Sequence, residues 1–348
     1  MTNQFSITQP LNPDPLNRGD RLGDIMLLEL IGQGGEGQIW SGVDGRRQRI
    51  VAVKVIDVLE QATSKLAKVS LQFERQVHLV ASIDHPNVLP LYHLGTFGSR
   101  FYFVMRYTPL GSLADLLEKG PLSLDETLYF SAQIALTLEH LHKKGVVHRD
   151  LKPSNILFGP ERQIYLADFG LAKRLSNETM ALHTGRGTGP YAPYEQHTMA
   201  QLTPQTDIYS LGIVIYEMLV GRLPWDGTTN LATRQFQDRV ELPDIHQLDD
   251  ELPLAITQAL REMTAFDWQQ RPATASEALQ LFVTAVDGIG QKQFVNLYSA
   301  PPVMEEDLLE AGTAQELWQK LREQGSNPLF IPLTYLALLD SAYSKEDV

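Results

Sequence analysis

The chain reads His148-Arg149-Asp150-Leu151-Lys152-Pro153-Ser154-Asn155 and, after a short segment, Asp168-Phe169-Gly170. Residues 163–167 between the two motifs favour a strand, because apolar and aromatic side chains dominate them. A chance match to the four fixed positions of HRDxxxxN has odds on the order of 10⁻³ in a chain of this length, even before DFG is required downstream. The two motifs together therefore indicate a functional site.

A glycine-rich stretch, Gly32-Gln33-Gly34-Gly35-Glu36-Gly37, lies far upstream and is followed by Ile39. Glycines let the backbone approach phosphate oxygens and donate N–H groups to them. Alone the stretch is a weak signal, because such turns are more often plain hairpins and the same spacing occurs in dinucleotide-binding folds. A dinucleotide-binding fold needs a helix directly afterwards, whereas residues 38–40 and 50–56 favour strands. The pattern predicts a glycine-rich hairpin laid over a nucleotide.

Lys54 lies within Val51-Ala52-Val53-Lys54 and is flanked on both sides by apolar residues, so a strand there would bury its ammonium group. A buried ammonium group needs anions nearby. An isolated lysine on an edge strand more often extends its head to water. The position of Lys54 downstream of the glycines favours a phosphate partner instead.

These motifs, in this order, resemble those of the protein kinase family, of the Ser/Thr type, and are most similar to the bacterial kinases with a eukaryotic-like catalytic domain. The resemblance covers about Asp24 to Asp287. It implies an α+β fold of two lobes, a small β-rich N-lobe with one long helix and a larger α-helical C-lobe. It also implies that ATP and Mg²⁺ bind in the cleft between the lobes, with protein substrates that carry Ser or Thr acceptors.

The periodicity of the sequence agrees with two unlike lobes. Strand-like runs fill residues 24–107 apart from one helix predicted at about 65–83, and helical spacing dominates from residue 111 to about 287. Capping boxes predict helix starts at Ser123 with Glu126 and at Thr274 with Glu277. The predicted parts are a tail (1–22), an N-lobe (23–107), a C-lobe (108–287) and an acidic extension (288–348).

The resemblance assigns the nucleotide contacts residue by residue. The glycine-rich loop over the phosphates comprises Gly32, Gln33, Gly34, Gly35, Glu36 and Gly37. The apolar residues around adenine are Ile31, Ile39, Ala52 and Leu157, with Met105 as gatekeeper and the backbone of Arg106 and Thr108 as hydrogen-bonding partners. Lys54 matches the lysine that contacts the α and β phosphates.

The catalytic assignments fall on the two opening motifs. Asp150 matches the carboxylate that orients the substrate hydroxyl and accepts its proton. Lys152 resembles the lysine that steadies the transferred phosphoryl group in Ser/Thr kinases, and Thr188 resembles their activation-segment threonine. Asn155 and Asp168 match the Mg²⁺ ligands, and oxygen donors suit that ion.

Three further residues resemble structural members of the family, and three positions depart from its pattern. Asp207 matches the buried aspartate that braces the catalytic loop, and Glu195 with Arg271 matches a buried ion pair. Gln76 stands where the family has the glutamate that pairs with the strand lysine. In Ala192-Pro193-Tyr194-Glu195 one residue separates the usual Ala-Pro from Glu, and Glu36 places an acid at the tip of the phosphate loop.

Arg149 before the catalytic aspartate is typical of kinases whose phosphorylated activation segment fills a basic pocket. The predicted phosphorylation sites are Ser176, Thr179 and Thr184, through self-association and trans-autophosphorylation. Two alternatives stay open: a pseudokinase scaffold that binds nucleotide without efficient transfer, and a small-molecule kinase of related fold.

Composition narrows the class further. The 348 residues carry 29 basic and 42 acidic side chains, a net charge of −13, and no cysteine. The absence of cysteine excludes thiol nucleophiles, disulfides and cysteine-bound metals. The acidic balance and the lack of a basic cluster argue against nucleic acid as a partner. No signal peptide or membrane span is predicted, so a cytoplasmic location is expected.

Overall fold

The structure is a computed structural model that describes residues 15–34, 37–57, 82–97, 100–168, 189–197, 202–225, 241–246 and 252–287. The chain divides into two compact units. The first unit comprises the residues up to Gly111 together with residues 157–186, and the second comprises residues 112–156 and those from Gly187 onward. The helix predicted at about 65–83 lies almost wholly outside the described residues.

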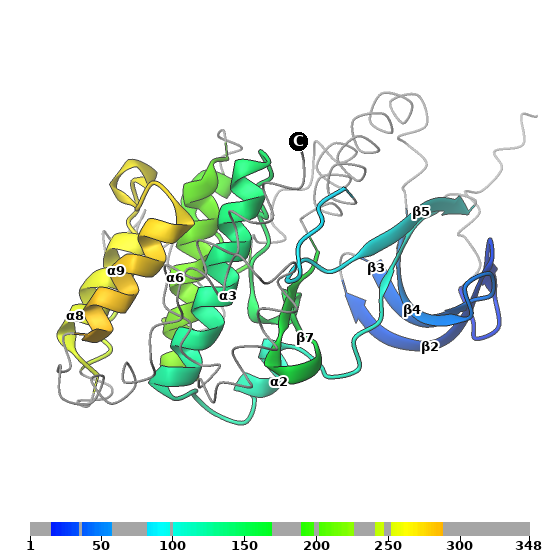
Figure 1. Cartoon of the computed structure of the whole chain (residues 1–348), viewed down its shortest axis with the longest axis horizontal. Coiled ribbons are helices and arrows are strands. Elements are labelled where there is room, and N and C mark those ends of the chain that lie inside the picture. Colours follow the sequence, from blue (N-terminus) through cyan, green and yellow to red (C-terminus); the bar gives the residue numbers. More distant parts are fainter. Residues whose placement is uncertain are drawn as a thin grey trace, which may run out of the picture. The chain divides into compact units, whose positions relative to one another are not determined.

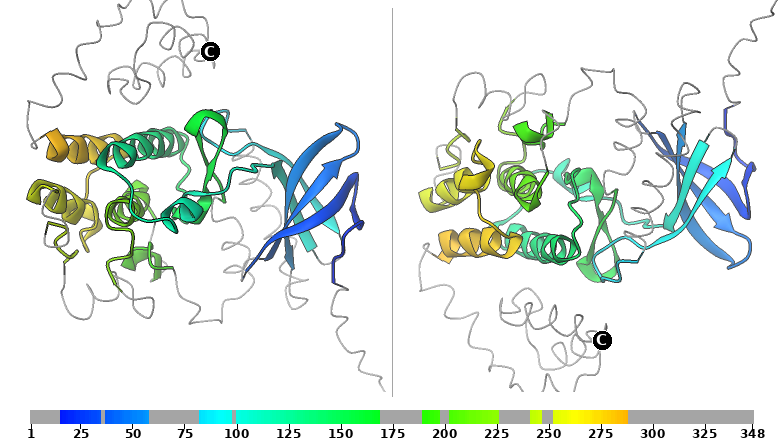
Figure 2. Two further views of the ribbon diagram at one scale, coloured as in Figure 1. Left: turned by 90° about the horizontal axis from the view of Figure 1, so that it is seen from below. Right: turned by 90° about the horizontal axis from the view of Figure 1, so that it is seen from above.

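The first unit is built on one antiparallel sheet of six strands in the order β1-β2-β3-β4-β6-β5. Its strands are β1 (Arg21–Leu22), β2 (Ile25–Gly34), β3 (Gly37–Asp44), β4 (Arg49–Asp57), β5 (Leu91–Phe97) and β6 (Arg100–Arg106). Both views of Figure 2 show these strands as a twisted sheet. The run predicted as a strand at residues 50–56 therefore lies in β4, and β6 lies within residues 24–107, where strand-like runs were expected.

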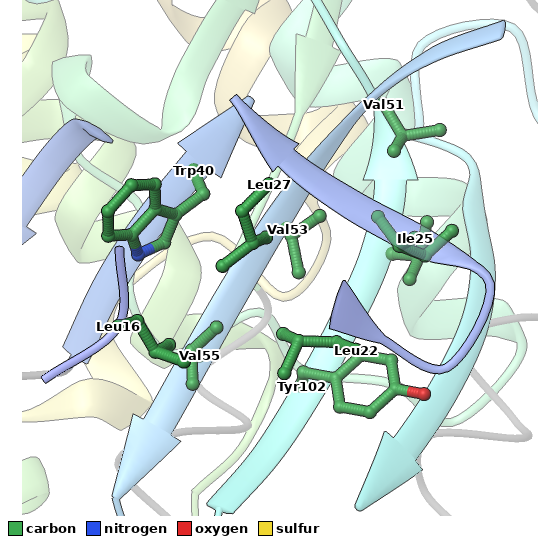
Figure 3. Packing of buried hydrophobic residues seen from close by; sticks show 10 residues of the cluster. Leu16, Leu22, Ile25, Leu27, Trp40, Val51, Val53, Val55 and Tyr102 are labelled. Carbon is green, nitrogen blue, oxygen red and sulfur yellow. The ribbon is translucent and has the colours of Figure 1, made fainter. Parts of the chain in front are cut away.

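Alternation along the strands decides which face of the sheet becomes the core. Val51, Val53 and Val55 of β4 are almost fully buried and pack with Trp40 of β3 and Tyr102 of β6 (Figure 3). Because successive strand residues point to opposite faces, Ala52 and Lys54 lie on the other face of β4. This alternation separates the hydrophobic core of the sheet from the face that carries the predicted nucleotide contacts.

Residues 157–168 belong to the first unit, although the predicted lobe boundary at 107/108 places them with the helices. They contain most of β7 (Ile156–Phe158), the 3-10 helix η3 (Pro160–Arg162) and β8 (Ile164–Leu166). Backbone hydrogen bonds attach β8 to the segment before β5: Leu89 donates to Leu166 O (2.9 Å), and Leu166 donates to Asn87 O (2.7 Å). These bonds keep the strand that leads to Asp168 with the sheet unit.

The second unit is helical. Its elements are α2 (Leu113–Leu117), α3 (Leu124–Lys143), η2 (Pro153–Asn155), α5 (Tyr194–His197), α6 (Pro204–Val220), α8 (Leu254–Met263), η4 (Trp268–Gln270) and α9 (Ala275–Asp287). Figure 1 shows α3, α6, α8 and α9 packed together. Helix α6 is buried along most of its length. At Gly212 a Cβ atom would lie 2.8 Å from Thr264 Cγ2, so glycine permits the close approach to the end of α8.

The helix signals in the sequence are confirmed with one difference. Ser123 and Glu126 form the predicted capping box of α3, and the stripe Phe130, Ile134, Leu138 and Leu141 is buried. At α9, Thr274 Oγ1 accepts from Glu277 N (3.1 Å), but the Glu277 carboxylate accepts from Ala273 N (2.8 Å) and so caps one residue earlier than predicted. Within the described residues no helix has the length and hydropathy needed to cross a membrane.

Candidate active site

The glycine-rich stretch forms the hairpin between β2 and β3. Gly34 pairs with Gly37, Gln33 with Gln38, and Gly32 with Ile39 in the antiparallel ladder. A strand follows the glycines, as predicted, which separates this hairpin from the helix-linked loop of dinucleotide-binding folds. Gly35 and Glu36, at the tip, lie outside the described residues.

Of the three described glycines of this stretch, Gly37 alone is required by the fold itself. Gly37 has φ +120°, and a Cβ atom there would lie 2.1 Å from the Val55 carbonyl oxygen. At Gly34 a Cβ atom would meet no atom of the described chain within 4 Å, and at Gly32 it would make ordinary contact with Ile39 at 3.6 Å. Because packing permits a side chain at positions 32 and 34, glycine there agrees with close approach of a ligand to the backbone.

Four predicted nucleotide contacts share one face of the sheet. Ile39 pairs with Lys54 across β3 and β4, and Ala52 pairs with Met105 across β4 and β6. Directly opposed residues of antiparallel strands point to the same face, and this face is the one opposite the valines of the core. The structure therefore brings Ile39, Ala52, Lys54 and Met105 together on that face.

An apolar layer lies beside these residues in the same unit. Met105 and Leu157 pack against the buried residues Leu89, Tyr165 and Ala167. Ile31 lies on β2 and keeps 47% of its surface exposed. The two remaining predicted contacts follow Met105: Arg106 ends β6 and donates its N–H to Pro90 O (3.0 Å), and Thr108 lies just beyond the strand.

Lys54 meets the anion that its burial requires. Its side chain is 8% exposed, and Nζ lies 2.5 Å from Oδ2 of Asp168, whose side chain is 21% exposed. Asp168 has φ +63°, a left-handed conformation that is uncommon for residues other than glycine. Since such strain recurs at functional sites, the backbone of Asp168 agrees with a role beyond packing. The two residues stand 114 positions apart in the sequence.

The catalytic-loop residues lie in the helical unit. Asp150 is 7% exposed, and its Oδ2 accepts from Lys152 Nζ (2.8 Å) and from Asn155 Nδ2 (2.9 Å). Asn155 Nδ2 also donates to the Asp150 backbone carbonyl (2.7 Å). Proline at the first position of η2 helps to start the turn that carries Asn155 back to Asp150. The three residues predicted from the HRDxxxxN motif therefore form one cluster around a carboxylate oxygen.

Asp207, which lies on α6, binds the backbone of this loop. Its Oδ2 accepts from His148 N (2.7 Å) and its Oδ1 from Arg149 N (2.8 Å), while His142 Nε2 lies 2.7 Å from Oδ2. Arg149 has φ +70°, so the two N–H bonds fix a residue in a strained conformation. The bracing role expected for Asp207 agrees with these contacts.

The same contacts stabilise the ionised form of the Asp207 carboxyl group. Complete burial alone raises the pKa of Asp207, but the hydrogen bond with His142, the charges of His142 and His148 and the Arg149 N–H outweigh it. The pKa of Asp207 is therefore lowered, and the carboxylate is ionised in the folded protein. His142 is a functional contact that the sequence analysis missed, because a histidine near the end of a helix has many ordinary explanations.

The lowered pKa of Asp207 predicts a specific acid sensitivity. A carboxyl group whose pKa is lower in the folded state stabilises the protein above its unfolded pKa, and this contribution is lost as the pH falls through the folded pKa. Asp207→Asn should lower the free energy of unfolding by about 3 kcal/mol at neutral pH. Urea unfolding across a pH series should show the gap between wild type and variant narrowing below about pH 4. A constant gap, or a variant as stable as the exposed control Asp125→Asn, would contradict this prediction.

The second predicted structural contact is also present. Arg271 Nη1 and Nη2 bind Glu195 Oε1 (2.6 Å) and Oε2 (3.1 Å), and the side chains are 0% and 10% exposed. Glu195 therefore keeps this partner despite the displaced residue in Ala192-Pro193-Tyr194-Glu195. Close by, Tyr191 donates its hydroxyl to Glu217 Oε2 (2.6 Å), and burial raises the pKa of Glu217. This contact has no signal in the sequence.

Several predicted positions lie outside the described residues. They are Gln76, Ser176, Thr179, Thr184 and Thr188.

Comparison with known proteins agrees with this geometry. The model of the protein kinase domain family matches residues 25–283, about three quarters of the chain. The chain belongs to the protein kinase family. The serine/threonine-protein kinase PrkC of Bacillus subtilis is 30% identical over 305 residues, which cover 84% of this chain and 46% of the relative. The probable serine/threonine-protein kinase PknB of Lactococcus lactis is 30% identical over 277 residues, 77% of this chain and 43% of that protein.

Solved structures show the same kinase fold. The kinase domain of PknI from Mycobacterium tuberculosis matches with a TM-score of 0.64 at 19% identity, covering 78% of this chain and 99% of that domain. The predicted kinase architecture, with a β-sheet unit and a helical unit, is therefore confirmed. This kinase chain spans less than half the length of the curated relatives it matches.

The donor atoms predicted to bind metal fit Mg²⁺ chemically. Asp168 supplies a partly exposed carboxylate and Asn155 an amide oxygen, both hard oxygen donors. Within the described residues no group of three or more His, Asp or Glu side chains gathers as a metal cage. Few protein ligands suit Mg²⁺, which keeps several waters and binds phosphate oxygens.

Proposed function

We propose that this chain is an ATP-dependent serine/threonine protein kinase. The observation that carries the proposal is the cluster at Asp150, where Lys152 and Asn155 both bind one carboxylate oxygen. A nearly buried carboxylate held by a cation and an amide is oriented without freedom to rotate. Such a group is suited to position a hydroxyl and to accept its proton during phosphoryl transfer.

The proposed reaction assigns one role to each residue. The oxygen of the substrate hydroxyl forms a bond to the γ-phosphorus of ATP, the bond from phosphorus to the β–γ bridging oxygen breaks, and ADP leaves. Asp150 accepts the hydroxyl proton, and Lys152 stabilises charge on the transferred group. Lys54 contacts the α and β phosphates, and Asn155 and Asp168 would hold Mg²⁺. When bound, the ion would neutralise phosphate charge.

The proposal also covers the nucleotide contacts, the bounds of the kinase domain and the phosphorylation sites. The backbone of residues 32–37 covers the phosphates, and Ile31, Ile39, Ala52, Met105 and Leu157 enclose the adenine with the backbone of Arg106 and Thr108. The kinase domain extends over residues 23–287. Lys152 supports Ser and Thr as acceptors, and Arg149 supports activation by autophosphorylation at Ser176, Thr179 or Thr184 through self-association.

Intact mass measurement tests the proposal directly. Protein freed of phosphate is incubated with Mg-ATP and a general Ser/Thr protein substrate, and phosphate addition to protein is the expected result, with peptide mapping to locate it. ATP binding without transfer to any protein would favour the pseudokinase scaffold, which Gln76 makes conceivable. Phosphorylation of a sugar or another small molecule, but of no protein, would also overturn the proposal.

A further inference from the structure

Gln196 makes an unexpected contact with the catalytic loop. This residue lies in the short helix α5, and its Nε2 donates to the backbone carbonyl of Arg149 at 2.6 Å. The two residues are 47 positions apart in the sequence. Gln196 thus links the segment that follows the activation segment to the residue directly before Asp150.

The carbonyl that accepts this bond is part of a strained residue. Arg149 has φ +70°, and its N–H already donates to Asp207 Oδ1 (2.8 Å). With Gln196 bound to its carbonyl, Arg149 is held on both sides, by an acceptor on α6 and a donor on α5. A left-handed residue other than glycine persists when its surroundings over-determine it, and Gln196 supplies one of those constraints.

The bond also restrains the peptide unit that joins Arg149 to Asp150. The Arg149 carbonyl and the Asp150 N–H belong to one planar peptide unit, which rotates as a rigid body. Gln196 holds the carbonyl end of this plane, and His148 Nδ1 accepts from the Asp150 N–H at 3.3 Å at the other end. Rotation about the Cα–C bond of Arg149 would turn this plane and move the Cα atom that carries the Asp150 carboxylate.

Gln196 itself is firmly placed. Its neighbour Glu195 is in the buried two-point ion pair with Arg271, and Gln196 N donates to Pro193 O at 3.1 Å. Its other amide atom, Oε1, is buried without a hydrogen-bonding partner among the described residues. A buried acceptor without a partner destabilises the folded state. The hydrogen bond from Gln196 Nε2 to the Arg149 carbonyl must offset this free energy.

We infer that Gln196 is a positioning residue for Asp150, acting through the Arg149 carbonyl. The inference rests on the proposed function for its effect on activity. Its structural basis, the restraint of the catalytic-loop backbone, is independent of whether phosphoryl transfer occurs. The restraint and the activity can therefore be measured separately.

Gln196→Met removes the donor and nearly preserves the volume of the side chain. We expect kcat for phosphorylation of a Ser/Thr peptide to fall about tenfold, since one of the hydrogen bonds that restrain the loop is lost, while the KM for ATP stays close to the wild-type value. Gln196→Glu keeps the shape but places a carboxylate against the carbonyl, so its kcat should fall further. The matched control is Gln280→Met, because Gln280 is exposed on α9 and its Nε2 donates to Thr284 Oγ1 of the same helix.

Amide hydrogen exchange gives a readout that needs no activity. Peptides covering residues 146–152 should exchange about tenfold faster in Gln196→Met than in wild type, and should be unchanged in the Gln280 control. Equal exchange in wild type and Gln196→Met overturns the inference, whether or not the protein transfers phosphate. If exchange is faster in Gln196→Met than in wild type, but the wild-type protein phosphorylates nothing, the restraint stands and only the proposed function is rejected.

Discussion

Asp150→Asn is expected to lower kcat for peptide phosphorylation by about 10³-fold, the range found when a general base is removed. The substitution keeps the shape of the side chain but removes the charge that Lys152 Nζ approaches at 2.8 Å and the oxygen that can accept a proton. ATP affinity should change little, because the residues proposed to contact the nucleotide are elsewhere in the chain. Steady-state kinetics together with a nucleotide-binding titration separate the two effects.

The control for this prediction is Asp125→Asn, which makes the same chemical change at an exposed position in the first turn of α3. Its activity should equal that of the wild type, and both variants should unfold at nearly the same urea concentration as the wild type. If Asp150→Asn retains a large part of the wild-type kcat, Asp150 is not the base and the proposed mechanism is wrong.

Arg271→Met is expected to produce the largest loss of stability, about 3–5 kcal/mol in the free energy of unfolding. Arg271 is fully buried and binds both carboxylate oxygens of Glu195, and it also donates to the backbone carbonyls of Ala265, Gln205 and Phe266. Without the guanidinium group, the Glu195 carboxylate remains buried without its compensating charge. Urea unfolding followed by circular dichroism measures the loss.

Two variants test whether the burial of the pair causes this effect. Arg18→Met removes an ion pair with Glu29 whose side chains are 72% and 62% exposed, so it should cost less than about 1 kcal/mol. Arg271→Met combined with Glu195→Gln removes both charges and should recover part of the loss. An equal effect of Arg18→Met and Arg271→Met would show that burial of the pair is not what stabilises the second unit.

The nucleotide side of the site was largely predictable from the sequence. The glycines, the apolar run around Lys54 and the strand before Asp168 are local patterns, and the strands β2, β3, β4 and β8 formed where those patterns indicated. The period of two along a strand is enough to place Ala52 and Lys54 on the face opposite the valines. The placement of residues 157–168 in the sheet unit was not predictable, because it depends on backbone bonds to residues 87–89.

The supports of the catalytic loop were predictable only in part. Asp207 and the pair of Glu195 with Arg271 followed from the family resemblance, but His142 and Gln196 did not. A glutamine after a glutamate and a histidine near a helix end carry no local signal of function. Their roles arise from the atoms they meet, Asp207 Oδ2 and the Arg149 carbonyl, which only the packing of α3, α5 and α6 brings near.

The sequence by itself determined the family, the order of the motifs and the chemical types at the site, because each depends on residue identity at short and fixed spacings. Tertiary structure alone decided how those groups are held: Lys54 against Asp168 across 114 positions, and the Arg149 peptide between Asp207 and Gln196. The physical reason is that a hydrogen bond depends on distance and direction between atoms. Between residues far apart in the chain, both are set by the packing of helices and strands and leave no periodic trace in the sequence.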